Sequence, residues 1–229
     1  MSITAAEVKA LRTQTGAGMM DCKRALQESE GNIEKAVEIL RLKGQKVAAK
    51  RSDREASEGV ILSGVSSNGK TGIAMSLNCE TDFVAQNADF ISVAQTLLDL
   101  AIADVCESKE DLLAKQFPGS DMTVADKIID ETGKIGERIE IGGFKVTSGE
   151  TVASYIHPGN RLATVVGFSG SVDSGVGRDV AMQAAAMAPV AVDQSQIPED
   201  LIAKEKEIAR DLAIQEGKPA ELADKIAVG

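Results

Sequence analysis

The sequence has few of the residues that build most catalytic and metal sites. It contains one histidine, His157, and three cysteines, Cys22, Cys79 and Cys106, among 229 residues. The cysteines lie far apart and form no C-x-x-C pair, so we expect neither a disulfide framework nor a zinc site. A Ser-His-Asp arrangement stays open, but no Gly-x-Ser-x-Gly motif supports one. The sequence therefore favours a binding protein that is not an enzyme and holds no cofactor or metal.

Aromatic residues and positive charge are also scarce. Tryptophan is absent and aromatics make up 3% of the chain, so the core must be aliphatic and any exposed aromatic is a candidate anchor. The net charge of -10 disfavours nucleic acid or an anionic membrane as the main ligand. The basic run from Arg41 to Arg54 is the exception. We interpret it as a solvated linker, with a contact to RNA as the alternative.

Long apolar runs are missing as well. None approaches the roughly 18 residues that suggest a membrane span, and no signal segment opens the chain. The composition, 43% hydrophobic and 26% charged, is that of a soluble protein with one medium-sized domain or two to three small ones. Together with the unpaired cysteines, this predicts a cytoplasmic location.

Three helical patterns fill the first fifty residues. Thr4 and Glu7 have the spacing of a capping box, and the first pattern ends at Gly16. A second pattern covers about 20–28, and Asn32 can cap a third, which is expected to end at Gly44. Three short helices of this size make a small bundle of the kind that recognises partners.

Two methionines, Met19 and Met20, lie between the first and second of these helices. Methionine either fills gaps in a core or forms an adaptable docking surface. We favour core filling, since it is the more common use.

The segment 60–77 predicts a β-hairpin, because alternating apolar residues flank Asn68-Gly69. It also contains the phosphate-loop pattern G-x-x-x-x-G-K-[ST] between Gly64 and Thr71. A phosphate loop must open a helix, whereas 71–77 alternates with the period of a strand. We therefore favour a hairpin turn and keep a nucleotide-binding enzyme as the alternative.

The remaining patterns predict further helices and strands. Helices are expected over 90–102, around Leu112 and after Thr123, followed by a buried helix over 175–188. Strands are expected over 139–146, 152–156 and 162–168, with turns at Gly142-Gly143, Ser148-Gly149 and Pro158-Gly159. These hairpins imply an antiparallel sheet.

A helical hairpin is expected at the end of the chain. Its first arm begins at Pro198 and carries Leu201, Glu205, Ile208 and Leu212 at near-heptad spacing. Gly217-Lys218-Pro219 then reverses the chain, which gives a hairpin with one apolar seam. Such a hairpin packs on a partner, on a second copy as a homodimer, or on its own chain, and the sequence leaves these open.

One stretch, 77–87, places an acid and an aromatic side by side where a strand gives way to a helix. These residues are Asp82 and Phe83. A junction of this kind is well suited to presenting a side chain to a partner.

Two motifs resemble the signatures of the bacterial elongation factor Ts family, the nucleotide exchange factors of the GTPase elongation factor Tu. The first runs from Leu11 to Leu26, and the second, Asn-Cys-Glu-Thr-Asp-Phe-Val, from Asn78 to Val84 with Asn87 beyond it. Further similarity lies at 46–54, at Ile135-Gly136 and over 155–161.

The resemblance implies an α+β fold with an N-terminal three-helix bundle like a ubiquitin-associated domain, a core in two halves and a protruding antiparallel helical hairpin. The corresponding divisions are 1–54 for the bundle and basic linker, 55–147 and 148–192 for the two core halves, and 193–229 for the hairpin.

The resemblance also implies a partner, elongation factor Tu, and a set of contact residues. Asp82 and Phe83 would enter next to the partner's magnesium and phosphate site, flanked by Thr81 and Val84. His157, Ile135 and Gly136 would support that contact, and Leu11, Met19 and Met20 would hold a neighbouring helix of the partner. No direct contact with nucleic acid or membrane is implied.

The sequence departs from the family pattern in two respects. Ser76 and Gln86 stand where the family usually has an acid and a basic residue, which concerns the rim of the contact. Family members also generally continue beyond Gly229, so we expect a truncated form with an incomplete second core half and a shortened second hairpin arm.

Overall fold

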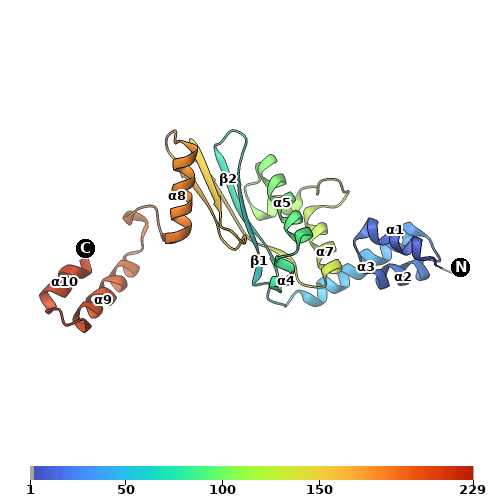
Figure 1. The fold of residues 1–229 in the computed structure, drawn as a ribbon, viewed down its shortest axis with the longest axis horizontal. Helices are drawn as coiled ribbons and strands as arrows, with labels where there is room; N and C mark the ends of the chain where they lie inside the picture. Colours follow the sequence, from blue (N-terminus) through green and yellow to red (C-terminus); the bar gives the residue numbers. More distant parts are fainter. Residues whose placement is uncertain (1–2, 229) are drawn as a thin grey trace. The chain divides into compact units, whose positions relative to one another are not determined.

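The computed structural model describes residues 3–228 (Figure 1). The chain forms two compact units, one extending to Ala186 and the other beginning at Met187. Helices and antiparallel sheets occur in separate runs of the chain, which confirms the expected α+β class. No helix among the described residues combines the length and the hydropathy needed to cross a membrane. The division of the chain into four parts stays a prediction, and we use first core half and second core half below only as names for residues 55–147 and 148–192.

The N-terminal bundle consists of α1 (Ala5–Thr15), α2 (Met19–Glu28) and α3 (Ile33–Arg51). Both expected caps form: Thr4 and Glu7 make a capping box on α1, and the Asn32 side chain accepts from the Lys35 amide at 2.9 Å. The bundle has a core of its own, made of Val8, Leu11, Ala17, Cys22, Ala25, Leu26 and Ala36. The three-helix bundle expected from the sequence is confirmed.

Helix α3 does not end at Gly44, and the interpretation of the basic run as a linker is wrong as far as Arg51. The helix continues to Arg51, so every basic residue of the run except Arg54 lies in α3. Gly44 is buried against Gly133 of α7 (Val124–Ile135), where a Cβ added to Gly133 would lie 2.3 Å from the Gly44 Cα. A glycine inside a helix costs about 1 kcal/mol relative to alanine, and the close approach of two helices offsets that cost.

The first core half is built on a sheet with the order β1-β2-β3, made of β1 (Glu58–Val65), β2 (Thr71–Cys79) and β3 (Glu140–Ser148). All pairings are antiparallel, and Asn68-Gly69 forms the turn between β1 and β2, with Gly69 at φ +71°. Because Thr71 begins a strand rather than a helix, the phosphate-loop interpretation is wrong.

Gly142-Gly143 does not form a turn, contrary to the expectation. Both glycines lie within β3, where the register with β2 shifts between Met75 and Leu77. A Cβ added to Gly142 would lie 2.6 Å from the Asn78 side chain, and the Gly143 amide donates to the Ser76 hydroxyl at 2.8 Å. The glycines therefore accommodate a β-bulge, a common use of glycine inside a strand.

Four helices accompany this sheet: α4 (Asp82–Ala85), α5 (Ala88–Ala103), α6 (Lys109–Ala114) and α7. Helix α5 confirms the helix expected over 90–102 and packs on β1 and β2 (Figure 1). Leu97 and Leu98 of α5 are fully buried, as are Ile73 and Leu77 of β2. This core is the platform from which α4 projects.

The second core half contains β4 (Thr151–Ile156) and β5 (Ala163–Phe168), which form a two-stranded antiparallel sheet, and α8 (Ser174–Met187). The strands confirm the prediction, but the expectation of a buried helix is wrong. Only Gly177, Ala181 and Ala185 of α8 are buried, while Val176 is 56% exposed. Gly177 lies close to Ala153 of β4, and the Ala181 carbonyl accepts from the Thr164 hydroxyl of β5, so α8 meets this sheet along one face only.

The second unit contains a short 3₁₀ helix (Gln194–Gln196) and a helical hairpin of α9 (Glu199–Gln215) and α10 (Ala220–Val228). Gly217, at φ +82°, reverses the chain, and Arg210 pairs with Asp224 at 2.5 Å between the arms. The antiparallel hairpin is confirmed, but its seam is not the predicted one. Ala213 and Ala223 are buried and Leu212 is 54% exposed, because small side chains let the two helices approach closely.

Candidate partner-binding site

The stretch that follows β2 forms a single helical turn with one buried face. Thr81 caps α4, its hydroxyl accepting from the Val84 amide at 3.5 Å. Ala85 is buried and Val84 packs against the hydrophobic core of the first core half. The turn is therefore fixed to the core on one side and faces solvent on the other.

Phe83 is the exposed aromatic that the sequence led us to look for. Its side chain is 84% exposed, whereas Phe90, on the next helix, is 3% exposed. Asp82 beside it is exposed as well. Fully burying a phenylalanine contributes about 1.5–3 kcal/mol, so a solvent-facing one on an ordered turn favours a surface that is covered in a complex.

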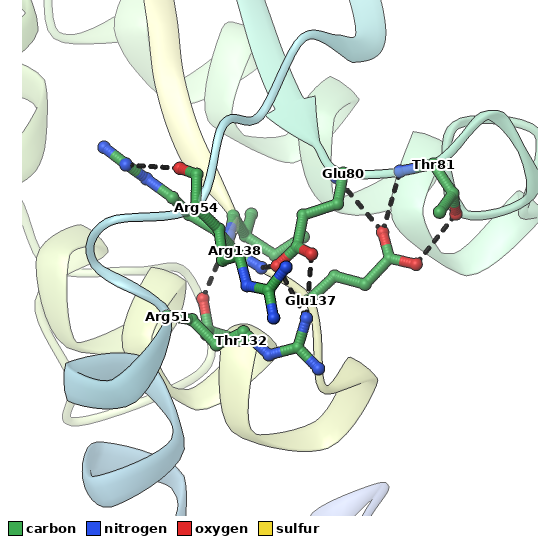
Figure 2. A network of polar contacts seen from close by, with 8 residues as sticks. Arg51, Arg54, Glu80, Thr81, Thr132, Glu137 and Arg138 are labelled. Atoms are coloured by element: carbon green, nitrogen blue, oxygen red, sulfur yellow. Dashed lines mark hydrogen bonds and ion pairs between the residues drawn. The ribbon is translucent and has the colours of Figure 1, made fainter.

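Glu137 holds the backbone just before this turn. Its carboxylate accepts from the Glu80 amide at 3.1 Å, the Thr81 amide at 3.0 Å and the Thr81 hydroxyl at 2.8 Å (Figure 2). Glu137 follows Gly136, which ends α7 in the left-handed conformation at φ +82°. The sequence reasoning did not single out Glu137, although it did single out the adjacent Ile135-Gly136.

Glu80 makes the reciprocal contact. Its carboxylate accepts from the Arg138 amide at 2.7 Å and from the Arg51 guanidinium at 2.8 and 2.9 Å. The Arg138 amide, followed by the Arg51 side chain, holds the pKa of Glu80 below its usual value. We call Glu80, Thr81, Glu137 and Arg138 the clamp, because each of its two segments receives hydrogen bonds from the other.

The clamp also reaches the end of α3. The Arg138 guanidinium donates to the Ser52 carbonyl at 2.5 Å and the Arg54 carbonyl at 2.6 Å, and pairs with Glu140 at 2.6 Å. Together with Arg51, these contacts join the last turn of the bundle to the stretch that presents Phe83 (Figure 2).

Cys79, the last residue of β2, is buried and unpaired. Its thiol contacts the Thr81 carbonyl at 3.1 Å, and burial, together with the negative charge of Glu137, raises the pKa of Cys79 to about 11. A thiol with so high a pKa is a poor nucleophile at neutral pH, so Cys79 serves as packing.

Two further predicted residues, Ile135 and Gly136, lie close to α4. Ile135 and Val84 border one hollow of about 410 Å³, together with Phe90 and with Gly16 from the bundle. Gly136 lies next to Glu137 of the clamp. The structure thus brings the stretch 81–84, the end of α7 and the edge of the bundle into one region.

His157 occupies an exposed turn after β4. The Tyr155 hydroxyl lies 3.0 Å from its Nδ1, and its amide donates to the Leu162 carbonyl at 2.8 Å. These contacts belong to the turn itself and do not connect His157 to α4.

The three bundle residues fall into two classes. Met19 and Met20 are 57% and 63% exposed at the start of α2, so the core-filling interpretation is wrong. Cys22, Ala25 and Leu26 occupy the positions of α2 that face the core. Leu11 is fully buried, so it supports the bundle and is out of reach of a direct contact.

Known proteins resemble the whole chain. The family model described as "Elongation factor TS" matches residues 80–229. A protein of Christiangramia forsetii named "Elongation factor Ts" is 50% identical over 99% of this chain and 82% of its own length. The proteins of the same name from Flavobacterium psychrophilum and Chloroherpeton thalassium are 50% and 46% identical, over 82% and 81% of their lengths.

Proposed function

This chain belongs to the elongation factor Ts family, and on that premise we propose that it promotes release of GDP from elongation factor Tu by inserting Asp82 and Phe83 beside the partner's magnesium and phosphate site. We call Asp82 and Phe83 the wedge. As a member of the family the chain is a translation elongation factor. The observation that carries the proposal is the 84% exposure of Phe83 on an anchored turn.

The wedge would act by displacement rather than by covalent chemistry. Mg²⁺ requires near-octahedral oxygen ligands at about 2.0–2.1 Å, so a small shift of the elements that carry those ligands weakens the link between metal and GDP. An aromatic ring is bulky enough to cause such a shift, and its burial in the partner supplies favourable free energy. Asp82 brings a negative charge to the same place, where it would compete with the phosphates for the metal.

The binding of GDP and the binding of the factor to elongation factor Tu weaken each other, and this linkage completes the exchange cycle. If the factor weakens GDP binding by a given ratio, GDP weakens the binding of the factor by the same ratio. Rebinding of a nucleotide then releases the factor. The protein would need no cofactor of its own and would act on the magnesium and GDP held by the partner.

The supporting contacts would come from three places. Thr81, Val84, Ile135 and Gly136 surround the wedge, the exposed Met19 and Met20 offer an adaptable apolar surface on the bundle, and His157 lies on a separate exposed turn. The net charge of -10 disfavours nucleic acid and anionic membranes as partners, and we place the activity in the cytoplasm. Self-association through the helical hairpin remains part of the proposal.

A nucleotide-release assay tests the proposal. Elongation factor Tu is loaded with a fluorescent GDP analogue, and release is followed after unlabelled GDP is added with and without this protein. We expect faster release with the protein and loss of most of the effect in Phe83→Ala. Since Phe83 is 84% exposed, the variant should keep its thermal unfolding midpoint.

The matched control is Val105→Ala. Val105 is also an exposed apolar residue, 55% exposed, and it follows α5 at the end opposite to α4. This variant should release GDP as the unchanged protein does. Equal release with and without the protein would refute the exchange function, and a stable complex without faster release would indicate an adaptor instead.

A further inference from the structure

The wedge is carried by a turn too short to be stable by itself. Helix α4 has four residues, and a single helical turn fixes several dihedral angles for one hydrogen bond. Buried Ala85 and half-buried Val84 anchor its C-terminal end. The N-terminal end, from which Asp82 and Phe83 project, must be held by polar contacts.

Glu137 provides these contacts. A carboxylate has two oxygens and accepts several hydrogen bonds, and Glu137 receives three, from the Glu80 amide, the Thr81 amide and the Thr81 hydroxyl. Because the Thr81 hydroxyl gives its proton to Glu137 at 2.8 Å, its lone pairs are free to accept from the Val84 amide. Glu137 therefore fixes both the backbone before the turn and the cap that begins it.

The direction of Glu137 is itself fixed. Gly136 turns the chain at a positive φ of 82°, which places Glu137 just beyond the end of α7. The next residue, Arg138, donates its amide to Glu80 at 2.7 Å, so the two segments hold one another in both directions. The residues just after β2 and just after α7 thus meet the end of α3 at the base of the wedge (Figure 2).

We propose that Glu137 is a positioning residue for the wedge, which fixes the direction of Phe83 before the partner binds. This inference rests on the proposed function. Glu137 would touch neither the nucleotide nor the metal and would act through Thr81 and Glu80. Without it, α4 populates several conformations, and the apparent strength of the partner interaction falls in proportion to the fraction that is competent.

The first test measures how GDP release from elongation factor Tu rises with the concentration of the factor. The slope of the GDP-release rate against the concentration of the factor should fall about tenfold in Glu137→Ala. This fall is expected if roughly one molecule in ten keeps the competent conformation of α4. Glu137→Gln, which keeps the shape and one acceptor oxygen, should lie between Glu137→Ala and the unchanged protein. A slope in Glu137→Ala equal to that of the unchanged protein would overturn the proposal.

A double-variant comparison separates positioning from general destabilisation. If Glu137 acts only through the wedge, adding Glu137→Ala to the variant that lacks both wedge side chains, Asp82→Ala with Phe83→Ala, should slow GDP release no further, because coupled residues are not additive. A further fall on adding Glu137→Ala to this double variant would indicate a structural role elsewhere and would overturn the proposal.

Hydrogen exchange supplies a readout that needs no partner. The amides of Glu80 and Thr81 should exchange faster in Glu137→Ala, while those of Leu97 and Leu98 in the core should keep their protection. Unchanged exchange at Glu80 and Thr81 would also contradict the proposal.

Glu7→Ala is the matched control. Glu7 likewise accepts from the amide and the hydroxyl of a threonine, Thr4, at 2.7 and 2.8 Å, but it does so at the start of α1. The slope should be unchanged in Glu7→Ala, and a loss equal to that of Glu137→Ala would count against the proposal. Full release by Phe83→Ala would refute the wedge itself, whereas loss in Phe83→Ala with full release in Glu137→Ala would refute only the positioning role.

Discussion

The two core halves contain the same kinds of elements but differ in what they bury. In the first, β2 and α5 bury large side chains, with Ile73, Leu77 and Leu97 at most 1% exposed. In the second, the contact between α8 and the β4-β5 sheet is made by small residues, and Gly177 lies so close to Ala153 that an added Cβ would be 3.0 Å from its Cβ. The first half thus has a hydrophobic core of its own, whereas the contact between α8 and the sheet of the second half buries mainly small residues.

The second half is also attached to the first through the hairpin turn of β1 and β2. The Val152 amide donates to the Gly69 carbonyl at 2.8 Å, and Gly72 leaves room for Val152 and Val165. Because the wedge and the clamp belong to the first half and to the end of α3, they rest on the better packed part of the molecule. A site that depends on the direction of one side chain requires such support.

The largest effect is expected from a cavity in the first half. Leu97→Ala removes a fully buried side chain of α5 and should lower the free energy of unfolding by about 2–5 kcal/mol. Urea unfolding followed by circular dichroism measures it. A loss below 1 kcal/mol would show that the first half is no better packed than the second.

A smaller loss is expected at the contact between α3 and α7. Gly133→Ala places a methyl group 2.3 Å from the Gly44 Cα, so the helices must move apart, at a cost of about 1–3 kcal/mol. In Gly170→Ala, beyond β5, the added methyl group would meet no atom within 4 Å, and this variant is the control. Equal stability of the two variants would contradict the close helix contact.

The contact between Gly44 and Gly133 shows which features of the fold could not be predicted from the sequence. The caps at Thr4 and Asn32 and the turn at Asn68-Gly69 were predicted correctly, because each depends on residues within three or four positions. Gly44 was interpreted as the end of a helix. The residue that makes a glycine necessary at this position, Gly133, lies far along the chain, where no local pattern reveals it.

The candidate site, too, was predicted only in part from the sequence. Asp82 and Phe83 stood out by their position after a strand, but the period of the sequence could not show that Phe83 is exposed. Glu137 was missed because its hydrogen-bond donors, Glu80 and Thr81, precede it by 57 and 56 residues. No local pattern encodes such a partnership, although a glycine that ends a helix close to a suspected site is a reason to inspect the residue after it.

Acid should weaken the clamp before it weakens the apolar cores. The pKa of Glu80 is lower in the folded protein, first through the Arg138 amide and then through Arg51. Its stabilising contribution is therefore present above the unfolded pKa of about 4.3 and is lost as the pH falls through the lower, folded value. The free energy of unfolding should decline below about pH 4.3, and less steeply in Glu80→Gln. Parallel pH profiles of the two proteins would contradict this assignment.

The smallest effect is expected in the second half, on the outer face of α8. Val176 is 56% exposed, so Val176→Ala removes few contacts and replaces a β-branched residue with a better helix former. The free energy of unfolding should change by less than about 0.5 kcal/mol, measured in the same urea titration as Leu97→Ala. A loss near 2 kcal/mol would mean that this face is covered in solution, and that the second half has more packing than the isolated chain displays. Repeating the measurement at several protein concentrations would then identify a second copy as the cover, because only an association between molecules makes stability depend on concentration.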